Sequence, residues 1–436
     1  MKKYNAYKDS EVKWIGEIPE HWEITPLKFC FKVLSGATPK STELSYWEDG
    51  NINWITPADF KTEDRFISDG VKKITKEGFM SCSTTLIPSG SIIFSKRAPI
   101  GSVVINSNEV CTNQGCLSCI PKDDISSLFF YYIMSVSQKY FDMLGTGTTF
   151  NEISANVFKN VHLPVPPLSE QQAIASYLDA KTEKMDQMIA KAEKKIEYLG
   201  ELKQSLITRA VTRGLNPNAP LKDSGVKWIG DIPRDWEIPR LNFVTSKIGS
   251  GSTPKGGSEV YVDEGVVFLR SQNVYNDGLR LNDVVHIVPS IHEQMKGTKV
   301  QVDDILFNIT GASIGRCCRF TKGIGEANVN QHVCIVRPKN ILPTFLMYCL
   351  QSFVGQTQLR QLLKGGNREG LSGESFKNFY VLLPSPNEQQ QIATYLDIKC
   401  SKIDHIVATQ KKKIAYLQEL KQSLITNVVT GKIKVS

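Results

Sequence analysis

Residues 170–212 read EQQAIASYLDAKTEKMDQMIAKAEKKIEYLGELKQSLITRAVT, and the stretch returns without a gap at 388–430 as EQQQIATYLDIKCSKIDHIVATQKKKIAYLQELKQSLITNVVT. Most aligned positions of the two copies are identical. In both copies, apolar residues recur in steps of three and four, which is the period of an amphipathic helix. Prolines precede each copy, and each ends near a glycine, Gly214 or Gly431, as helices often do. The sequence therefore predicts two long helices that share one pattern.

The spacing of Ser169 with Gln172, and of Asn387 with Gln390, predicts a capping box at each helix start. At 1.5 Å per residue such a helix is about 65 Å long, more than a compact domain of this size covers. We therefore predict an antiparallel coiled coil between the two copies. The alternative, in which each helix packs on its own domain, fits the narrow seam and the Lys-rich remainder less well. The predicted seam comprises Ile174, Leu178, Met185, Ile196, Leu199, Leu202 and Leu206, facing Ile392, Leu396, Ile403, Ile414, Leu417, Leu420 and Leu424.

Composition places the chain among ordinary globular proteins. Its 436 residues suggest two to four domains, and no apolar run approaches a membrane span. The start, MKKYNAYKDSEVKW, has no signal-peptide core, and ten cysteines without a disulfide-like spacing indicate a reducing cytoplasm. The formal charge of +8 permits an anionic partner without requiring one.

The duplication extends beyond the two helices. Residues 7–29 match 221–243, and each is followed by a short glycine turn, SGATPK at 35–40 or SGSTPK at 250–255. Between these turns and the helices the halves diverge. A Pro/Asn linker at 214–220 separates them. The predicted organisation is a globular domain at 1–167, a long helix at 168–213, a second globular domain at 214–385 and a second long helix at 386–436.

Each divergent middle has the composition of a mixed α/β domain. One helix is expected in each, at Ser127–Met143 and at Pro343–Leu362. The predicted fold class is α+β, with two α/β domains joined by an antiparallel coiled coil and related by an internal pseudo-two-fold axis. Strands are predicted at Ile52–Ile55, Leu86–Phe94, Ser102–Ile105, Val266–Leu269, Ile305–Ile309 and Val333–Val336.

Two similar but non-identical domains at a fixed spacing are suited to reading two half-sites on double-stranded DNA. Polar residues of the divergent loops are the candidate DNA contacts, although any one of them could simply be solvated. Asn113-Gln114 and Asn330-Gln331, kept in both halves, are interpreted as scaffold. The candidates are Thr38, Lys40, Thr56, Asp59, Lys61, Lys96, Arg97, Thr146, Thr148, Thr149 and Asn151 in the first half, and Thr253, Lys255, Arg270, Ser271, Gln272, Asn273, Asn308, Thr310, Lys364, Asn367 and Arg368 in the second.

Catalytic signals are weak. The sequence contains no N/D-P-P-Y/F loop of an amino-methyltransferase and no GxxxxGK[ST] phosphate loop. The Glu-Leu-Lys triplets at 201–203 and 419–421 have the spacing of a nuclease motif, but a surface ion pair explains them better. Cys111, Cys116 and Cys119 lack a matching second CxxC pair, so buried thiols are favoured over a zinc site. We expect no catalytic residue, no metal and no cofactor on this chain.

The repeated ExQQxIAxYLDxKxxKxD…LxELKQSLIT helix, the WIGxIPxxWE segment and the Ser/Thr-Pro-Lys turn together resemble the specificity subunit of type I restriction–modification systems. The resemblance covers nearly the whole chain. It implies a non-catalytic subunit whose two target recognition domains read a bipartite, asymmetric target. It also implies that the helices set the spacer and dock two methyltransferase subunits, to which restriction subunits can be added. S-adenosylmethionine, ATP and Mg²⁺ are then expected on the partners, in an adenine-N6 methyltransferase and ATP-dependent endonuclease.

Two alternatives remain open at the level of sequence: a DNA-binding adaptor of a methylation-only complex, and a coiled-coil protein that binds only other proteins. The repeated tryptophans bear on partner docking. Trp14, Trp22, Trp228 and Trp236 could edge a docking surface, although capping of the domain cores is the favoured interpretation.

Overall fold

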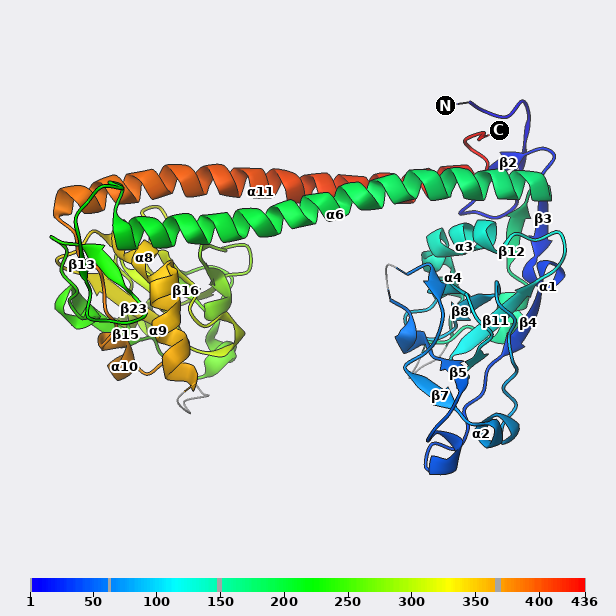
Figure 1. The fold of residues 1–436 in the computed structure, drawn as a ribbon, viewed down its shortest axis with the longest axis horizontal. Coiled ribbons are helices and arrows are strands. Elements are labelled where there is room, and N and C mark those ends of the chain that lie inside the picture. The colour runs from blue at the N-terminus through cyan, green and yellow to red at the C-terminus, as the bar shows by residue number, and fades with distance from the viewer. Residues whose placement is uncertain (1, 62–63, 147–150, 365–369, 436) are drawn as a thin grey trace. The chain divides into compact units, whose positions relative to one another are not determined.

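A computed structural model describes residues 2–61, 64–146, 151–364 and 370–435. The chain divides into two compact units (Figure 1). The first unit contains Met1–Ala192 and Lys412–Ser436, and the second contains Glu193–Lys411. Each unit therefore combines one globular domain with parts of both long helices.

The first unit is built on two sheets. The larger has the order β4-β11-β8-β9-β6 and the smaller the order β10-β5-β7. Their strands are β4 (Phe31–Ser35), β11 (Cys116–Pro121), β8 (Ile92–Ser95), β9 (Val103–Asn106) and β6 (Phe66–Ile67), with β10 (Cys111–Thr112), β5 (Ile52–Ile55) and β7 (Lys72–Ile74).

The second unit has a similar arrangement. Its two larger sheets have the orders β15-β23-β20-β21 and β19-β16-β22, and the first of these has no strand in the place of β6. In both three-stranded sheets the central strand pairs parallel with one neighbour and antiparallel with the other, so the two divergent middles share this part of their topology. The strands are β15 (Thr245–Ser250), β23 (Val333–Pro338), β20 (Ile305–Asn308) and β21 (Cys317–Arg319), with β19 (Val285–Ile287), β16 (Val266–Leu269) and β22 (Ala327–Val329).

The long helices are α6 (Leu168–Arg213) and α11 (Pro386–Val429). In the first unit the start of α6 lies antiparallel to the end of α11, where Lys421 Nζ is 2.6 Å from Asp186 Oδ1. In the second unit the same pair recurs with the helices exchanged, since Lys203 Nζ lies 2.7 Å from Asp404 Oδ1. The antiparallel coiled coil is thus confirmed within each unit, and the Glu-Leu-Lys lysines are confirmed as members of surface ion pairs.

Most of the residues predicted for the apolar seam are buried or partly buried. Ile174 and Leu178 are fully buried in the core of the first unit, and Ile392 and Leu396 in that of the second. Leu420 contradicts the prediction, because 38% of it is exposed. A straight helix drifts by about 20° per heptad against a 3.5-residue repeat, so an apolar stripe extrapolated over many turns leaves the contact face. Of the other predicted seam residues, Leu199, Ile403, Leu417 and Leu424 are buried, whereas Met185, Ile196, Leu202, Leu206 and Ile414 are partly buried.

The ends of the helices bury residues that the seam prediction omitted. Ile207 and Val211 of α6 enter the core of the second unit, and Val428 and Val429 of α11 enter the core of the first. Each globular domain is therefore packed around the final turns of a long helix. This packing requires the helix ends to be rigid parts of the domains.

The helix starts differ from the predicted capping boxes. Both helices begin one residue before the predicted caps, so Ser169 and Asn387 lie inside the first turn. The carbonyl of Pro167 accepts the N–H groups of Glu170 and Gln171 instead, and the Ser385 hydroxyl accepts the Glu388 N–H at 3.4 Å. The Pro167 carbonyl and the Ser385 hydroxyl therefore satisfy the N–H groups of Glu170 and Glu388, which lie in the first turn and have no i−4 partner in the helix.

Polar residues that recur in both helices attach each domain to its helix. Trp22 Nε1 donates to Glu170 at 3.1 Å, and Trp236 Nε1 donates to Glu388 at 2.9 Å. Both indoles are buried, so these two tryptophans belong to the cores. Further along each helix, a tyrosine makes a second contact. The Tyr132 hydroxyl donates to Asp179 at 2.6 Å, and the Tyr348 hydroxyl donates to Asp397 at 2.7 Å.

A buried glutamine completes each attachment. The Gln171 side chain accepts the Ser126 N–H at 2.8 Å and donates to the carbonyls of Asp124 and Pro166. It thereby fixes the start of α3 (Ser127–Val136), which lies next to α6 (Figure 1). In the second unit Gln389 accepts the Leu342 N–H at 2.8 Å, at the start of α8 (Pro343–Gln351).

We expect Gln171→Leu to destabilise the first unit by about 2–4 kcal/mol, because it leaves buried N–H and carbonyl groups without partners. Gln172→Leu is the matched control, since the neighbouring Gln172 is exposed. The measurement is urea unfolding followed separately in each unit. A change no larger than that of the control would show that the glutamine does not hold α3 in place.

Three predicted segments are interrupted. The helix predicted at Ser127–Met143 is two helices, α3 and α4 (Gln138–Leu144), and that at Pro343–Leu362 is α8 and α9 (Phe353–Lys364). The breaks fall at Ser137 and Ser352, whose hydroxyls donate to the carbonyls of Ile133 and Cys349 and compete with helical bonding. The strand predicted at Leu86–Phe94 is limited to β8, because Pro88 has no N–H and Gly90 adopts a positive φ of 83°.

Candidate nucleic-acid interface

Most of the predicted contact residues of the first unit lie on loops that meet at one end of its sheets. The turn after β4 approaches the 113–115 loop, because the Ala37 N–H donates to the Thr112 carbonyl at 2.9 Å. In the same loop, the Gly115 carbonyl accepts the Lys96 N–H at 3.0 Å, and the Asn113 N–H donates to the Ile55 carbonyl. The ends of β4, β5, β8 and β10 thus present one surface.

The second unit forms the equivalent surface. The Asn330 N–H donates to the Leu269 carbonyl at 3.0 Å, and the Ile309 N–H donates to the His332 carbonyl at 3.0 Å. The Ser252 N–H donates to the Val329 carbonyl at 3.2 Å. The ends of β15, β16, β20 and β22 are thereby joined in the same way as in the first unit.

The glycine turns pack directly on these loops. A side-chain carbon at Gly36 would lie 2.2 Å from the Asn113 carbonyl oxygen, and one at Gly251 would lie 2.0 Å from the Val329 carbonyl oxygen. Only glycine allows this approach. It brings the Thr38 hydroxyl into a hydrogen bond with Gln114, and the Thr253 hydroxyl into one with Gln331.

A histidine extends the network in the second unit alone. His332 Nε2 is 3.1 Å from Gln331 Nε2, and His332 Nδ1 is 2.6 Å from the Thr310 hydroxyl. The corresponding position in the first unit is Gly115. The two surfaces therefore share a scaffold and differ in the groups they present. Sequence reasoning missed His332, since no ligand or motif spacing marks it.

Three lysines of the candidate set are open to a partner. Lys40 and Lys255, which end the two glycine turns, are exposed, and so is Lys61. Ammonium groups in such positions can neutralise phosphates and give affinity that depends on salt but not on sequence. Thr146 and Asn151 are also exposed, and Asn151 Nδ2 lies 3.3 Å from the Asp142 carbonyl.

Lys96 and Arg97 are engaged by a carboxylate. Glu152 lies 2.8 Å from Lys96 Nζ and 2.6 Å from Arg97 Nε. Burial opposes ionisation of Glu152, but the hydrogen bonds from Lys96 and Arg97 keep its pKa below the usual value. The three side chains tie the end of β8 to the segment after α4, so both cations are less free than the sequence suggested.

This clamp should make stability depend on pH. Because the pKa of Glu152 is lowered in the folded state, its contribution is present above the ordinary carboxyl pKa of about 4.3 and is lost as pH falls through the folded-state value. We expect Glu152→Gln to cost no more than about 1 kcal/mol at pH 7, since Arg97 is exposed. The cost should vanish in acid. Thermal unfolding from pH 7 to 3 measures it, with the exposed Glu48→Gln as control, and a pH-independent cost would contradict the ionic explanation.

Other candidates serve the scaffold. Asn273 and Asn308 are 1% and 0% exposed, and their amides donate to the carbonyls of Arg280 and Ser271. The structure therefore corrects the prediction for these two, because a buried amide already committed to the backbone cannot reach a base. Asp59 accepts the Thr56 N–H and hydroxyl at 2.7 and 2.8 Å and closes its own turn.

The remaining candidates are divided between partly engaged and undescribed residues. Arg270 Nη2 donates to the Asp283 carbonyl at 3.0 Å, Gln272 donates to the Asp283 carboxylate at 3.0 Å, and Ser271 is partly buried. Lys364 is the last residue of α9, and its side chain is not described. Thr148, Thr149, Asn367 and Arg368 lie outside the described residues.

The cysteines form no reactive site. Nine of the ten are buried and Cys82 is partly buried. Burial raises the pKa of the Cys111 thiol to about 11 and that of Cys334 to about 12, which disfavours the thiolate that metal binding and nucleophilic attack require. Among the described residues, no three His, Cys, Asp or Glu side chains converge to hold a metal ion.

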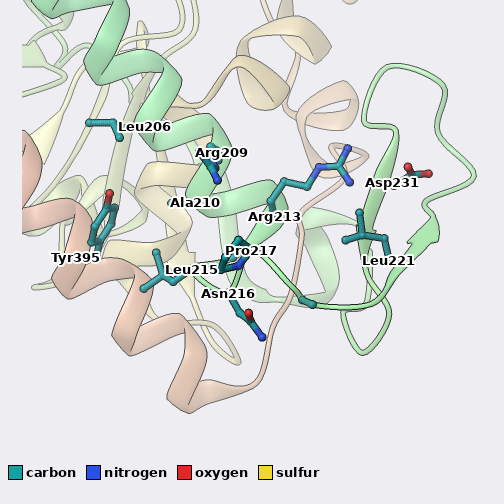
Figure 2. A pocket seen from close by; sticks show the side chains of 12 residues that line it. Leu206, Arg209, Ala210, Arg213, Leu215, Asn216, Pro217, Leu221, Asp231 and Tyr395 are labelled. Atoms are coloured by element: carbon teal, nitrogen blue, oxygen red, sulfur yellow. The ribbon is translucent and has the colours of Figure 1, made fainter.

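A pocket of about 570 Å³ lies in the second unit, away from the loops (Figure 2). It is formed by the end of α6, the linker and Tyr395. Arg209, Arg213 and Asn216 line it, together with Asp231. These residues offer no nucleophile with an adjacent base.

In the described part of the chain, no helix combines the length and apolar character needed to cross a membrane.

Each unit thus joins a loop surface that carries exposed lysines and polar groups to parts of the two long helices. The chain belongs to the family of the type I restriction modification DNA specificity domain, whose model matches residues 19–198 and again 233–417. The family and the duplicated loop surfaces together assign the chain a role in DNA sequence specificity.

Characterised proteins resemble the chain over its length. It is 26% identical to the type I restriction enzyme MjaIX specificity subunit of Methanocaldococcus jannaschii, over 97% of this chain and 95% of that protein. It is 28% identical to the EcoBI specificity subunit of Escherichia coli, over 73% and 68%. A structure described as the basis of complex assembly and conformational transition of the type I R-M system has a TM-score of 0.72 at 17% identity, covering 95% of this chain and 99% of that one. The HsdS subunit of Thermoanaerobacter tengcongensis has a TM-score of 0.50 at 17% identity, covering 95% and 98%.

Proposed function

We propose that each unit reads one half of a bipartite, asymmetric DNA target. The observation that carries this proposal is the repeated loop surface, which has one scaffold and two sets of exposed groups. Because the two scaffolds are alike, both units would dock on a duplex in the same way. The groups that differ between them, such as His332 in the second unit and Gly115 at the equivalent position of the first, would select different bases. A few base contacts per half-site would give about 1–3 kcal/mol of selectivity for each base pair.

The helices α6 and α11 are proposed to set the spacer between the half-sites and to dock two copies of a methyltransferase subunit. Two identical partners need two equivalent surfaces, and the repeated helices supply them. Tyr198 of α6 is 62% exposed, and Tyr416, its equivalent in α11, is 63% exposed. Aromatic residues in such positions are common at protein interfaces.

The chemistry is proposed to belong to the partners. S-adenosylmethionine would bind the methyltransferase subunits, which would methylate adenine at N6. ATP and Mg²⁺ would bind restriction subunits where these are present. A chain with free buried thiols that acts on DNA is proposed to work in the reducing cytoplasm.

The test is selection from a random DNA pool by the chain assembled with a methyltransferase subunit from its host. We expect enriched DNA with two short fixed half-sites and a random spacer of constant length. Methylation mapping in the host should return the same site. An enriched sequence without a spacer, or no enrichment, would contradict the proposal.

A further inference from the structure

Two phenylalanine rings are exposed at equivalent positions of the two units. Phe29 is 61% exposed and Phe243 is 67% exposed. They end the matching segments 7–29 and 221–243. Single exposed apolar residues are common on proteins. The same ring left uncovered twice, in halves that diverge immediately afterwards, points to a function that both units share.

A lysine stands beside each ring. Phe29 lies in α1 (Leu27–Cys30), and the Lys122 N–H donates to the Cys30 carbonyl at 3.1 Å. Phe243 ends η3 (Leu241–Phe243), and the Lys339 N–H donates to the Val244 carbonyl at 2.9 Å. Lys122 and Lys339 are both exposed. The backbone contact that places each lysine is therefore the same in both units.

The other cations near the two rings differ between the units. Lys28 Nζ lies 5.4 Å from the centre of the Phe29 ring and donates to Asn160 Oδ1 at 2.8 Å. In the second unit Arg240 Nη1 donates to Asn378 Oδ1 at 3.0 Å, and Lys377 is paired with Glu374 at 3.1 Å. We name the two shared sets the phenylalanine patches: Phe29 and Lys122 in the first unit, and Phe243 and Lys339 in the second.

The patches lie at the opposite end of the sheet from the loops that face DNA. In the first unit β11 pairs with β4 so that Pro121 faces Phe31 at the patch end, and Leu117 faces Ser35 at the loop end. Four steps along the strand, at about 3.3 Å each, separate the two ends by roughly 13 Å. In the second unit Pro338 lies opposite Thr245 at the patch end, after a register shift between Thr245 and Lys247 that the first unit lacks.

We propose that the phenylalanine patches dock two copies of one protein partner, the methyltransferase subunit, at a contact separate from the long helices. This rests on the proposed function above. A phosphate backbone offers no apolar surface to a phenyl ring, whereas a protein pocket does. The flanking lysines require that pocket to be edged by Asp or Glu. Identical patches on units with different recognition loops fit a partner that is identical on both sides.

The test is titration of the full chain with the methyltransferase subunit, followed by native mass spectrometry. Phe29→Ala and Phe243→Ala should each weaken binding of one copy at least tenfold, and the double variant should weaken both. Phe66→Ala is the matched control, because this residue is 51% exposed but has no equivalent in the other unit. The control should bind two copies as the unchanged chain does.

Unfolding temperatures of all variants should match the unchanged chain, since the rings are already exposed. Two copies bound by the double variant with unchanged affinity would overturn the proposal. The proposal would also be overturned if the double variant bound DNA more weakly in the absence of the methyltransferase subunit, because that result would show that the patches contact DNA. Failure of the proposed function is separate, since selection of a bipartite site by the unchanged chain tests it directly.

Discussion

Insertion of four residues between Lys194 and Lys195 of α6 is expected to change the preferred spacer and leave both half-sites unaltered. Four residues add about one helical turn, or 6 Å, to a helix that continues through both units. DNA rises about 3.4 Å per base pair, so the preferred spacer should change by one or two base pairs. DNA with the original spacer should bind at least tenfold more weakly, because the second half-site contact loses its effective concentration. The measurement is selection from a pool with fixed half-sites and variable spacers.

The matched control is the same four-residue insertion in the 214–220 linker. Ile207 and Val211 anchor the end of α6 in the core of the second unit, so extra linker residues should form a larger loop and leave the spacer unchanged. Unchanged spacing after the α6 insertion would refute the proposal that the helix sets the spacer.

Exchange of residues 30–165 for the matching segment of another specificity subunit is expected to replace one half-site and preserve the other. The exchanged segment contains the loops that converge after β4, β5 and β8, whereas the second unit retains its own set. The measurement is methylation mapping of the hybrid assembled with its methyltransferase subunit. The old half-site should be lost entirely, because base contacts at several positions change together.

The structure adds a condition to this exchange. The segment includes Tyr132 and Arg65, which both contact Asp179 of α6. A donor segment without an equivalent of Tyr132 should pack poorly on α6. Replacing Asp179 with a residue that suits the donor segment should restore the packing. Exchange of residues 244–383 is the reciprocal control and should replace only the other half-site. A change in both half-sites from either exchange would contradict independent reading.

Some features of the fold follow from the sequence alone because they rest on short-range patterns. The period of apolar residues predicts α6 and α11, and the duplication of the whole stretch predicts their pairing. The matching segments 7–29 and 221–243 predict a repeated scaffold, and the structure contains a strand order shared by both units in four strands of the larger sheet and in the three-stranded sheet. The sequence predicts the polar residues of the loops at 38–40 and 96–97 as DNA contacts and the 113–114 loop as scaffold, and the strand ends bring the three loops together.

Other features depend on contacts between distant residues. The apolar pattern of residues 127–143 continues through Ser137, so only the backbone hydrogen bond of its hydroxyl reveals the break between α3 and α4. Asn308 has the composition of a DNA contact, but the fold buries it. The sequence by itself determined the duplication, the two long helices and the absence of familiar catalytic motifs, because local periodicity and repetition encode them. Only the tertiary structure decided which repeated residues attach a domain to its helix and which loop residues remain exposed. It also decided which end of each sheet carries the phenylalanine patches. The reason is that burial and hydrogen bonding are set by residues far apart in the chain.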